Sequence, residues 1–236
     1  MIWTISDLHL SHAQPKPMDI FGPHWKDHPE RIAASWRARV APEDWVLIAG
    51  DISWAMKLPE ALVDLRWIDA LPGRKVLIRG NHDYWCSRRV RPLRQHMPPS
   101  ITLLGADACD IGEAVVCGTR GWITPETPGF APATDEPIYQ RELAMLDRAL
   151  VHARQLAADG RPIIVMLHYP PFVNQQPTEF ARRIGACPGV RACIYGHLHR
   201  RQDHENAVNR TVDGVSYQLT AADFIGFGPV GVRGLS

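Results

Sequence analysis

Side chains that can bind metal ions occur in five short motifs, each directly after an apolar run. The motifs are Asp7-Leu8-His9, Gly50-Asp51, Gly80-Asn81-His82-Asp83, His168 and Gly196-His197-Leu198-His199. Their carboxylate, amide and imidazole groups suit Mn²⁺, Fe or Zn²⁺ better than Ca²⁺, which prefers oxygen ligands alone. The i, i+2 spacing in Asp7-x-His9 and His197-x-His199 lets an extended or turning segment offer both side chains to one centre.

The candidate ligands are more numerous than a single four- to six-coordinate ion needs. They are Asp7, His9, Asp51, Asn81, His168, His197 and His199. The set fits two ions if one carboxylate bridges them. Two ions about 3.5–4 Å apart commonly clamp the attacking and departing oxygens of a displacement at phosphorus. The motifs therefore indicate phosphoester chemistry.

The apolar runs before the motifs are predicted strands. They lie at 2–5, 45–49, 75–79, 163–167 and 192–195. Ligand sites in open α/β sheets form at the carboxyl ends of strands, so we expect these runs to bring the motifs together. Helical spacing of apolar residues predicts four helices. They begin near Pro29 and Pro59 and span 138–158 and 178–184.

Other segments have weaker signals. Three short runs predict an antiparallel strand group, either a second sheet or the edge of the first, at 101–104, 108–111 and 114–117. The Arg-rich segment 87–96, which includes Arg88, is predicted to be helical with an interruption at Pro92. Segment 120–135 is a predicted loop, a polar turn region follows His199, and the glycine-rich tail is expected to add edge strands.

The composition indicates one globular domain over residues 1–236, with 45% apolar residues. A net charge of +1 gives no basic footprint for duplex nucleic acid. The five cysteines form no C-x-x-C pair, which argues against a disulfide framework or thiolate zinc site and favours a reducing compartment. The first apolar run ends at Asp7, and no window has the length of a membrane span. We therefore expect a cytoplasmic protein with no membrane segment.

In its motifs and their order, the chain resembles the metallophosphoesterases of the calcineurin-like superfamily. The matching residues extend from 7 to 199, and no member of the pattern is missing. The resemblance implies an α/β fold of two mixed β-sheets packed face to face with flanking helices. It also implies a hydrolase acting on phosphoester bonds with two divalent first-row metal ions, Mn, Fe or Zn.

The resemblance further implies a role for each motif residue. Asp7, His9 and His199 would bind the first metal ion. Asn81, His168 and His197 would bind the second. Asp51 would bridge both ions, together with a water or hydroxide that attacks phosphorus in line. His82 would contact the substrate phosphate and serve as general acid for the leaving oxygen, with Asp83 orienting its ring.

Three further residues are candidate substrate contacts. Arg120 and Arg200 lie close to motif residues and are the candidates for binding phosphate, although for each arginine taken singly a surface or salt-bridging role is the favoured interpretation. His12 follows His9 by three residues and could line the mouth of the site. The other histidines outside the motifs are assigned to the surface. The tryptophans near the motifs, which are Trp54, Trp85 and Trp122, could stack on a base or sugar or pin their loops by packing.

Two questions stay open in the sequence. The substrate is expected to be a small phosphorylated molecule, but the motifs suit a phosphomonoester and a phosphodiester equally, and they leave the oligomeric state undecided. The alternative function is a non-catalytic binding or scaffold protein that retains the fold. Such a protein would be expected to lose metal ligands or His82, and all of them are retained here.

Overall fold

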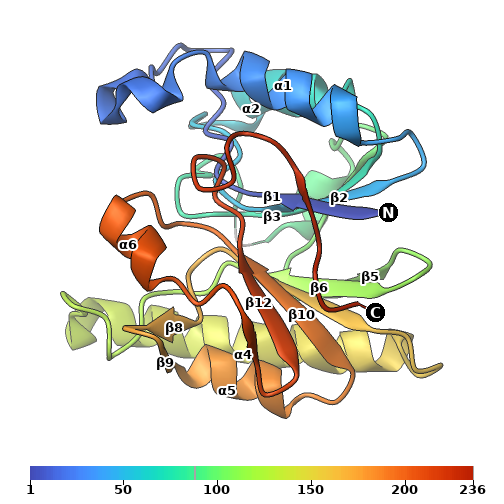
Figure 1. Ribbon diagram of the computed structural model, residues 1–236, viewed down its shortest axis with the longest axis vertical. Helices are drawn as coiled ribbons and strands as arrows, with labels where there is room; N and C mark the ends of the chain where they lie inside the picture. Colours follow the sequence, from blue (N-terminus) through green and yellow to red (C-terminus); the bar gives the residue numbers. More distant parts are fainter. Residues whose placement is uncertain (88, 236) are drawn as a thin grey trace.

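Two β-sheets form the centre of the protein in the computed structural model, which describes residues 1–87 and 89–235 (Figure 1). The five-stranded sheet has the order β13-β1-β2-β3-β4 and the six-stranded sheet the order β11-β12-β10-β7-β6-β5. The first sheet comprises β1 (Ile2–Ile5), β2 (Trp45–Ala49), β3 (Arg74–Ile78), β4 (Ile101–Leu103) and β13 (Val230–Gly231). The second comprises β5 (Ala108–Asp110), β6 (Val115–Thr119), β7 (Ile163–Leu167), β10 (Val190–Tyr195), β11 (Thr211–Val212) and β12 (Val215–Leu219). A separate hairpin pairs β8 (Phe172–Val173) with β9 (Gln176–Pro177).

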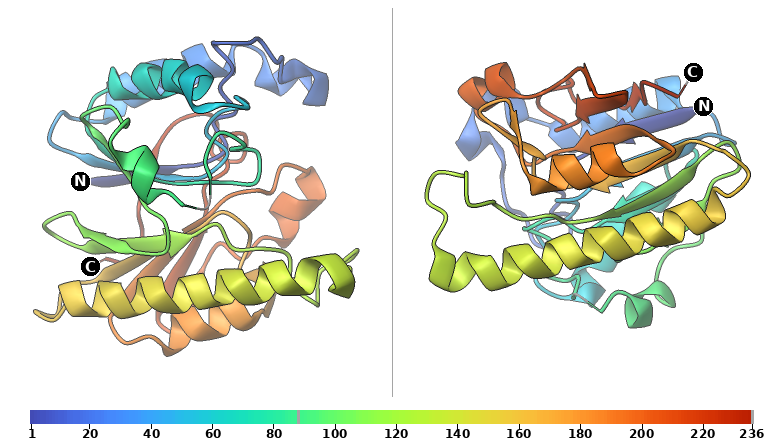
Figure 2. Two further views of the ribbon diagram at one scale, coloured as in Figure 1. Left: turned by 180° about the vertical axis from the view of Figure 1, so that it is seen from behind. Right: turned by 90° about the horizontal axis from the view of Figure 1, so that it is seen from below.

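Helices cover the outer faces of both sheets, as Figures 1 and 2 show. α1 (His28–Arg39) and α2 (Leu58–Asp69) lie over the first sheet, and α4 (Pro132–Leu156) and α5 (Glu179–Ala186) over the second. The shorter helices are α3 (Arg91–Arg94), α6 (Arg201–Asn206), η1 (Asp19–Phe21) and η2 (Pro23–Trp25). This arrangement confirms the predicted fold of two mixed sheets with flanking helices. None of the helices among the described residues is long and apolar enough to span a bilayer.

Alternate residues of the central strands pack on opposite faces of each sheet, as the two-residue period of a strand requires. In β2, Val46 and Ile48 pack outward toward α1 and α2, while Leu47 and Ala49 pack inward. The inward residues join others from the second sheet, such as Ile164, in one buried layer between the sheets. That shared layer favours the single domain predicted for residues 1–236, which stays a prediction.

Parallel pairing brings the carboxyl ends of the motif-bearing strands to the same edge. Ile5 of β1 is in register with Ile48 of β2, and Ala49 of β2 with Ile78 of β3. In the second sheet β7 runs parallel to both β6 and β10. The loops that follow these strands therefore meet where the two sheets face each other.

The weaker predictions for the segment 87–119 needed correction. β4 pairs parallel to β3 in the first sheet, whereas β5 and β6 form an antiparallel pair at the edge of the second. The three short runs are thus not one antiparallel group, because long-range pairing separated them. The Arg-rich segment contributes only the single turn of α3, and Arg88 lies outside the described residues.

Two helices also differ from prediction. α4 begins at Pro132, inside the segment predicted as a loop, because proline is well suited to the first turn of a helix. The polar region after His199 forms α6 rather than a turn. The tail does add an edge strand, since β13 pairs antiparallel with β1.

Candidate metal centre

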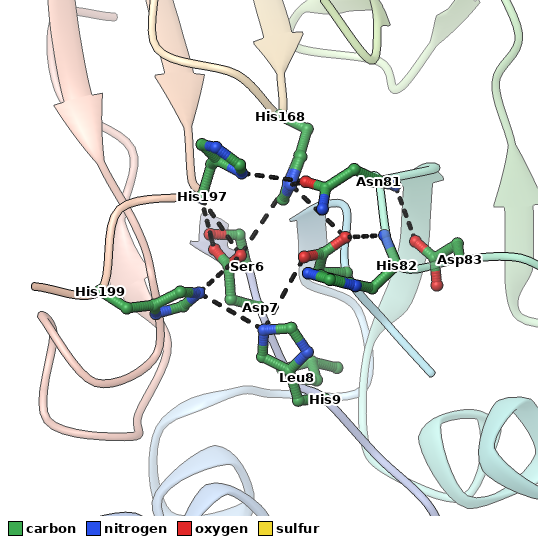
Figure 3. Close-up of polar contacts among 12 residues, drawn as sticks. Ser6, Asp7, Leu8, His9, Asn81, His82, Asp83, His168, His197 and His199 are labelled. Carbon is green, nitrogen blue, oxygen red and sulfur yellow. Dashed lines mark hydrogen bonds and ion pairs between the residues drawn. The ribbon is translucent and has the colours of Figure 1, made fainter. Parts of the chain in front are cut away.

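The predicted ligands converge from loops at the ends of five strands (Figure 3). β1 leads to Asp7 and His9, and β3 leads to Asn81 and His82. β7 leads directly to His168, and His197 and His199 follow β10. Asp51 follows β2. In Figure 3 the labelled side chains of Asp7, His9, Asn81, His168, His197 and His199 point toward one another around a common centre.

Four of these residues have backbone dihedral angles that L-amino acids rarely adopt. The φ angles are 57° at Asp7, 46° at His9, 51° at Asp51 and 75° at His197. Such left-handed residues cost conformational energy and persist only where the surrounding structure holds them, commonly at functional sites. Here the backbone turns back directly after a strand, which aims the side chain across the gap between the two sheets.

Two glycines allow the loops to approach the acidic ligands closely. A Cβ at Gly196 would overlap the Oδ2 atom of Asp7 and the side chain of Ser6, and a Cβ at Gly80 would overlap Asp51. Ser6 in turn donates a hydrogen bond of 2.5 Å to Asp7. Both glycines are therefore required by packing against the carboxylates, not by an unusual φ angle.

One group of ligand atoms comes from Asp7, His9 and His199, all lying within 4.8 Å of one another. The Nε2 atom of His199 is 3.4 Å from Asp7 Oδ1 and 3.4 Å from His9 Nε2. Three donor atoms at this separation can share one ion. The group coincides with the first metal site that the resemblance implied.

The second group is centred on His168, whose Nε2 atom is 3.4 Å from Asp51 Oδ1. Asn81 Oδ1 lies 2.7 Å from His168 Nε2 and 2.9 Å from His197 Nδ1. The other oxygen of Asp51, Oδ2, lies 3.8 Å from His9 Nε2 in the first group. Asp51 thus presents one oxygen to each group, as a bridging carboxylate would.

Charge pairs inside the centre shift the pKa values of its groups. Burial opposes ionisation of Asp7, but the nearby His199 outweighs burial and holds the pKa of this carboxyl at about 2. Burial also opposes protonation of His168 and His199. Nevertheless Asp51 raises the pKa of His168 to about 9, and Asp7 raises the pKa of His199 to about 10. Asp51 and Asp7 therefore each stabilise a protonated imidazole, on His168 and His199 respectively.

The other two imidazoles stay neutral. Burial lowers the pKa of His9 to about 3, and burial together with His168 lowers the pKa of His197 to about 3. Neutral imidazole nitrogens are good metal ligands, and a divalent cation could replace the charge of the two imidazolium protons. The donor set therefore fits first-row divalent ions.

Hydrogen bonds outside the centre orient two of the imidazoles. Nδ1 of His168 donates to the carbonyl of Ala49 at 3.0 Å, and Nδ1 of His199 lies 3.0 Å from Asp223 Oδ1. Both rings thereby turn Nε2 toward the other ligands, an arrangement common for metal-binding histidines. Asp223 was missed in the sequence analysis. Its signal was faint, because it lies four residues beyond the end of β12 and outside any recognisable motif.

The sequence profile of the family described as "Calcineurin-like phosphoesterase" matches residues 1–201. The match covers most of the chain and includes every candidate metal ligand. This chain belongs to the calcineurin-like phosphoesterase family. Such proteins depend on metal ions. Two sets of side chains here lie close enough together to hold an ion: Asp7, His9 and His199, and Asp7, Asp51 and His168.

Curated relatives match parts of this chain. The Gene 66 protein of Mycobacterium phage D29 is 43% identical over 98 residues, which are 41% of this chain and 45% of the phage protein. "[Acyl-carrier-protein] phosphodiesterase PptH" of Mycobacterium tuberculosis is 29% identical over 148 residues, 58% of this chain and 36% of PptH. The chain thus spans less than half the length of these curated relatives.

Solved structures share the fold of this chain at low sequence identity. TT1561 of Thermus thermophilus aligns with a TM-score of 0.58 at 13% identity, covering 100% of this chain and 98% of that one. Phosphopantetheinyl Hydrolase (PptH) of Mycobacterium tuberculosis aligns with a TM-score of 0.52 at 16% identity, covering 93% and 88%. Both agree with the four-layer arrangement of helices and sheets.

His82 lies beside the candidate metal ligands, but Asp83 does not touch its ring. The backbone N–H of His82 donates to Asp51 Oδ1 at 2.8 Å, and its Nδ1 lies 3.3 Å from the hydroxyl of Tyr84. Asp83 instead accepts hydrogen bonds from N–H groups of Ile52, Ser53, Gly80 and Trp85. The expected ring-orienting role of Asp83 is therefore corrected: this carboxylate ties the loops after β2 and β3 together.

Burial raises the pKa of Asp83 to about 6, and the charge of Asp51 adds to this effect. The four N–H donors act in the opposite direction, since they favour the ionised form. A carboxyl group in this position holds loop geometry and has no path to a substrate. Tyr84, whose ring is exposed, contacts the Nδ1 atom of His82 instead.

The three candidate substrate contacts occupy different surroundings. Arg120 is 11% exposed, lies 3.4 Å from the buried Glu142 and stacks on Trp122, so its expected phosphate contact is corrected to a salt-bridging role. His12 is held by Asp64 at 2.8 Å and does not line the cavity above the ligands. Arg200 does line that cavity, together with His82 and His199.

Aromatic residues surround the ligands more closely than predicted. Trp54 stacks on His9 at 4.9 Å between ring centroids, and Trp25 meets His199 edge to face at 5.6 Å. Trp25 was not singled out in the sequence. His28, assigned there to the surface, is 6% exposed because its ring bonds to the carbonyls of Trp25 and Leu8. These contacts pin the loop that carries His9.

Proposed function

We propose that this protein hydrolyses phosphoester bonds with two divalent first-row metal ions. Asp7, His9 and His199 would hold one ion, and Asn81, His168 and His197 the other. The observation that carries the proposal is the placement of Asp51, whose two oxygens face His9 and His168 at 3.8 Å and 3.4 Å. A single-ion site would not need both oxygens of one buried carboxylate directed at separate histidines.

Bound divalent ions would supply an acidified water, its pKa lowered from 15.7 toward roughly 7, and charge neutralisation for the phosphoryl oxygens. The chain itself supplies the proton for the leaving oxygen. His82 is half-buried, and its Nδ1 is beside Tyr84, so Nε2 is available to a substrate. Burial lowers the pKa of His82, and a bound phosphate anion would raise it again, which suits a group that must first hold and then release a proton.

A small phosphorylated molecule is the proposed substrate. The net charge of +1 favours a small anion over duplex nucleic acid, and PptH, a relative over part of the chain, is named a phosphodiesterase. The five cysteines are free, which supports the cytoplasmic location that we propose. Manganese is one of the ions that the mixed oxygen and nitrogen donors suit.

Removal of metal tests the proposal. Dialysis against a chelator should abolish hydrolysis of 4-nitrophenyl phosphate and bis(4-nitrophenyl) phosphate, because the proposed reaction needs the bound ions. Added Mn²⁺ should restore hydrolysis, because the folded chain keeps the ligands assembled. Circular dichroism of the dialysed protein would show that it stays folded. Undiminished hydrolysis by folded, metal-free protein would contradict the proposal.

The contact between His199 and Asp223 gives a separate prediction. Asp223→Asn should weaken the affinity for Mn²⁺ by about 10–100-fold, because the carboxylate that fixes the imidazole and raises its basicity is lost. Titration calorimetry with the metal-free protein measures this affinity directly. An affinity equal to that of the wild type would mean that Asp223 has no part in metal binding.

Gly196 gives a steric prediction with a matched control. Gly196→Ala should lower Mn²⁺ affinity by roughly tenfold or more, since the added methyl group must displace Asp7 from its position. Gly185→Ala, in α5 with no atom within 4 Å of the new Cβ, should leave the affinity unchanged. Equal affinities in both variants would contradict the close-packing argument.

A further inference from the structure

Two cavities flank the ligand cluster, one at each end. The first, called here the His197 cavity, has a volume of about 250 Å³ and is bordered by His197, Tyr169 and Leu198. The second, called the His82 cavity, has a volume of about 300 Å³ and is bordered by His82, His9 and His199. Their linings share no residue. A molecule centred on the ligands therefore meets a separate recess on each side.

The two cavities differ in charge. Apart from His197, the described lining of the His197 cavity includes one charged side chain, Asp203, and is otherwise mainly apolar or aromatic. The His82 cavity contains Arg200 and His24 and no carboxylate among its described residues. Lys16 lies outside this lining, but its Nζ is 3.6 Å from the ring centre of Trp54, which belongs to it. An anionic group is therefore favoured at the His82 cavity and disfavoured at the His197 cavity.

The wall of the His197 cavity is held in place before any ligand binds. The ring of Tyr169 lies 4.2 Å from that of His197, and Trp122 packs on Tyr169 at 5.2 Å. Trp122 is fixed in turn by a hydrogen bond of 3.1 Å to Asp135. An apolar recess of fixed shape beside a metal ligand is typical of a site for an organic group of a substrate.

We propose that the substrate is a phosphodiester whose uncharged organic arm binds in the His197 cavity and stays on phosphorus, while the leaving arm lies at the His82 cavity. This inference rests on the proposed hydrolysis at the same centre. A phosphomonoester has only one arm and would leave one of the two recesses unused. The cavity that includes His82 receives the leaving arm because that residue is the proposed proton donor.

The reaction consumes one water molecule per diester. The water oxygen forms a bond to phosphorus, and the bond between phosphorus and the leaving oxygen breaks with its electron pair on that oxygen. His82 donates a proton to the leaving oxygen and recovers one from the attacking water. The products are an alcohol from the His82 cavity and a phosphomonoester that carries the arm in the His197 cavity.

Two esters with one leaving group test this assignment. Methyl 4-nitrophenyl phosphate and phenyl 4-nitrophenyl phosphate both release 4-nitrophenolate and differ only in the arm that stays. With Mn²⁺-loaded wild type, kcat/KM should be roughly tenfold or more higher for the phenyl ester, because the ring is buried in an apolar recess. Ala207→Phe, which fills the recess, should reduce this preference to about one.

A second variant that fills the recess and two control variants complete the test. Ile123→Trp fills the same recess from another loop and serves if Ala207→Phe does not fold. Val151→Phe, on the outer face of α4 at a residue 57% exposed, should retain the full preference. Phe21→Ala, in the His82 cavity, should also retain it.

The outcomes separate the two proposals. Hydrolysis of both esters without preference for phenyl would overturn this inference and leave the proposed function standing. A preference that is lost in Phe21→Ala and kept in Ala207→Phe would overturn it too, since the retained arm would then lie in the other cavity. No hydrolysis of either ester or of 4-nitrophenyl phosphate would overturn both.

Discussion

Asp51→Asn should reduce phosphoester hydrolysis by at least about 10³-fold, because one neutral amide replaces the carboxylate that faces both ligand groups. The amide offers one oxygen instead of two and adds an N–H group where a cation is proposed. Loss of the charge also removes the partner of His168, whose raised pKa depends on it. Steady-state hydrolysis of bis(4-nitrophenyl) phosphate at saturating Mn²⁺ measures the effect.

The control for this variant is Asp213→Asn. Asp213 is exposed, and its φ angle of 49° is close to the 51° of Asp51, so the same substitution is made in the same backbone conformation. It should retain wild-type activity. Thermal unfolding of both variants would separate loss of function from loss of fold. Activity near the wild-type level in folded Asp51→Asn would exclude a bridging role.

His82→Ala should lower kcat by about 10²–10⁴-fold while metal content is unchanged, since general acid catalysis contributes on that scale. The ring lies over the ligands, 5.7 Å from His9 and 4.4 Å from Trp54 between centroids. Only the backbone N–H of His82 contacts Asp51, and that group survives the substitution. The proposed metal site should therefore stay intact.

The nature of the leaving group distinguishes a proton donor from a structural residue. The loss in His82→Ala should be large for a diester with an alkyl leaving group and smaller for 4-nitrophenolate, which leaves without a proton. His96→Ala, at an exposed histidine outside the motifs, is the matched control. An equal loss for both leaving groups would argue against proton donation by His82.

The central strands and the ligand motifs were predictable from the sequence because both are local. The strands that precede the motifs are mostly apolar, and each ligand follows its strand within a few residues. The turn back into the site was not predictable. It depends on left-handed backbone at Asp7 and Asp51, and no short sequence pattern predicts that conformation for an aspartate.

The surroundings of the site depended on contacts distant in sequence. Asp223 reaches His199, and Asp64 reaches His12, across 24 and 52 residues. Arg120 looked available for phosphate, but the fold places the buried Glu142 beside it. Asp83 follows His82 directly, yet four N–H groups from two loops turn its carboxylate away. Tertiary packing determines which of several possible side chains each of these polar groups contacts.

Strand pairing was the least local feature. The run at 101–104 resembles its neighbours at 108–111 and 114–117 in length and polarity, but it pairs with β3. Sequence proximity favours hairpins, and here the parallel neighbour was preferred because it extends the buried face of the first sheet. The β5–β6 pair was the part of that prediction that the structure retained.

The number of metal ions per chain tests the central claim most directly. Wild-type protein loaded with Mn²⁺ and freed of excess ion by gel filtration should contain two manganese ions per chain by plasma mass spectrometry. His82→Ala should contain the same number. The count should fall in Asp51→Asn, which loses the carboxylate facing both ligand groups. No bound metal in folded wild-type protein would contradict the metal centre, and one ion per chain would contradict the bridging role of Asp51.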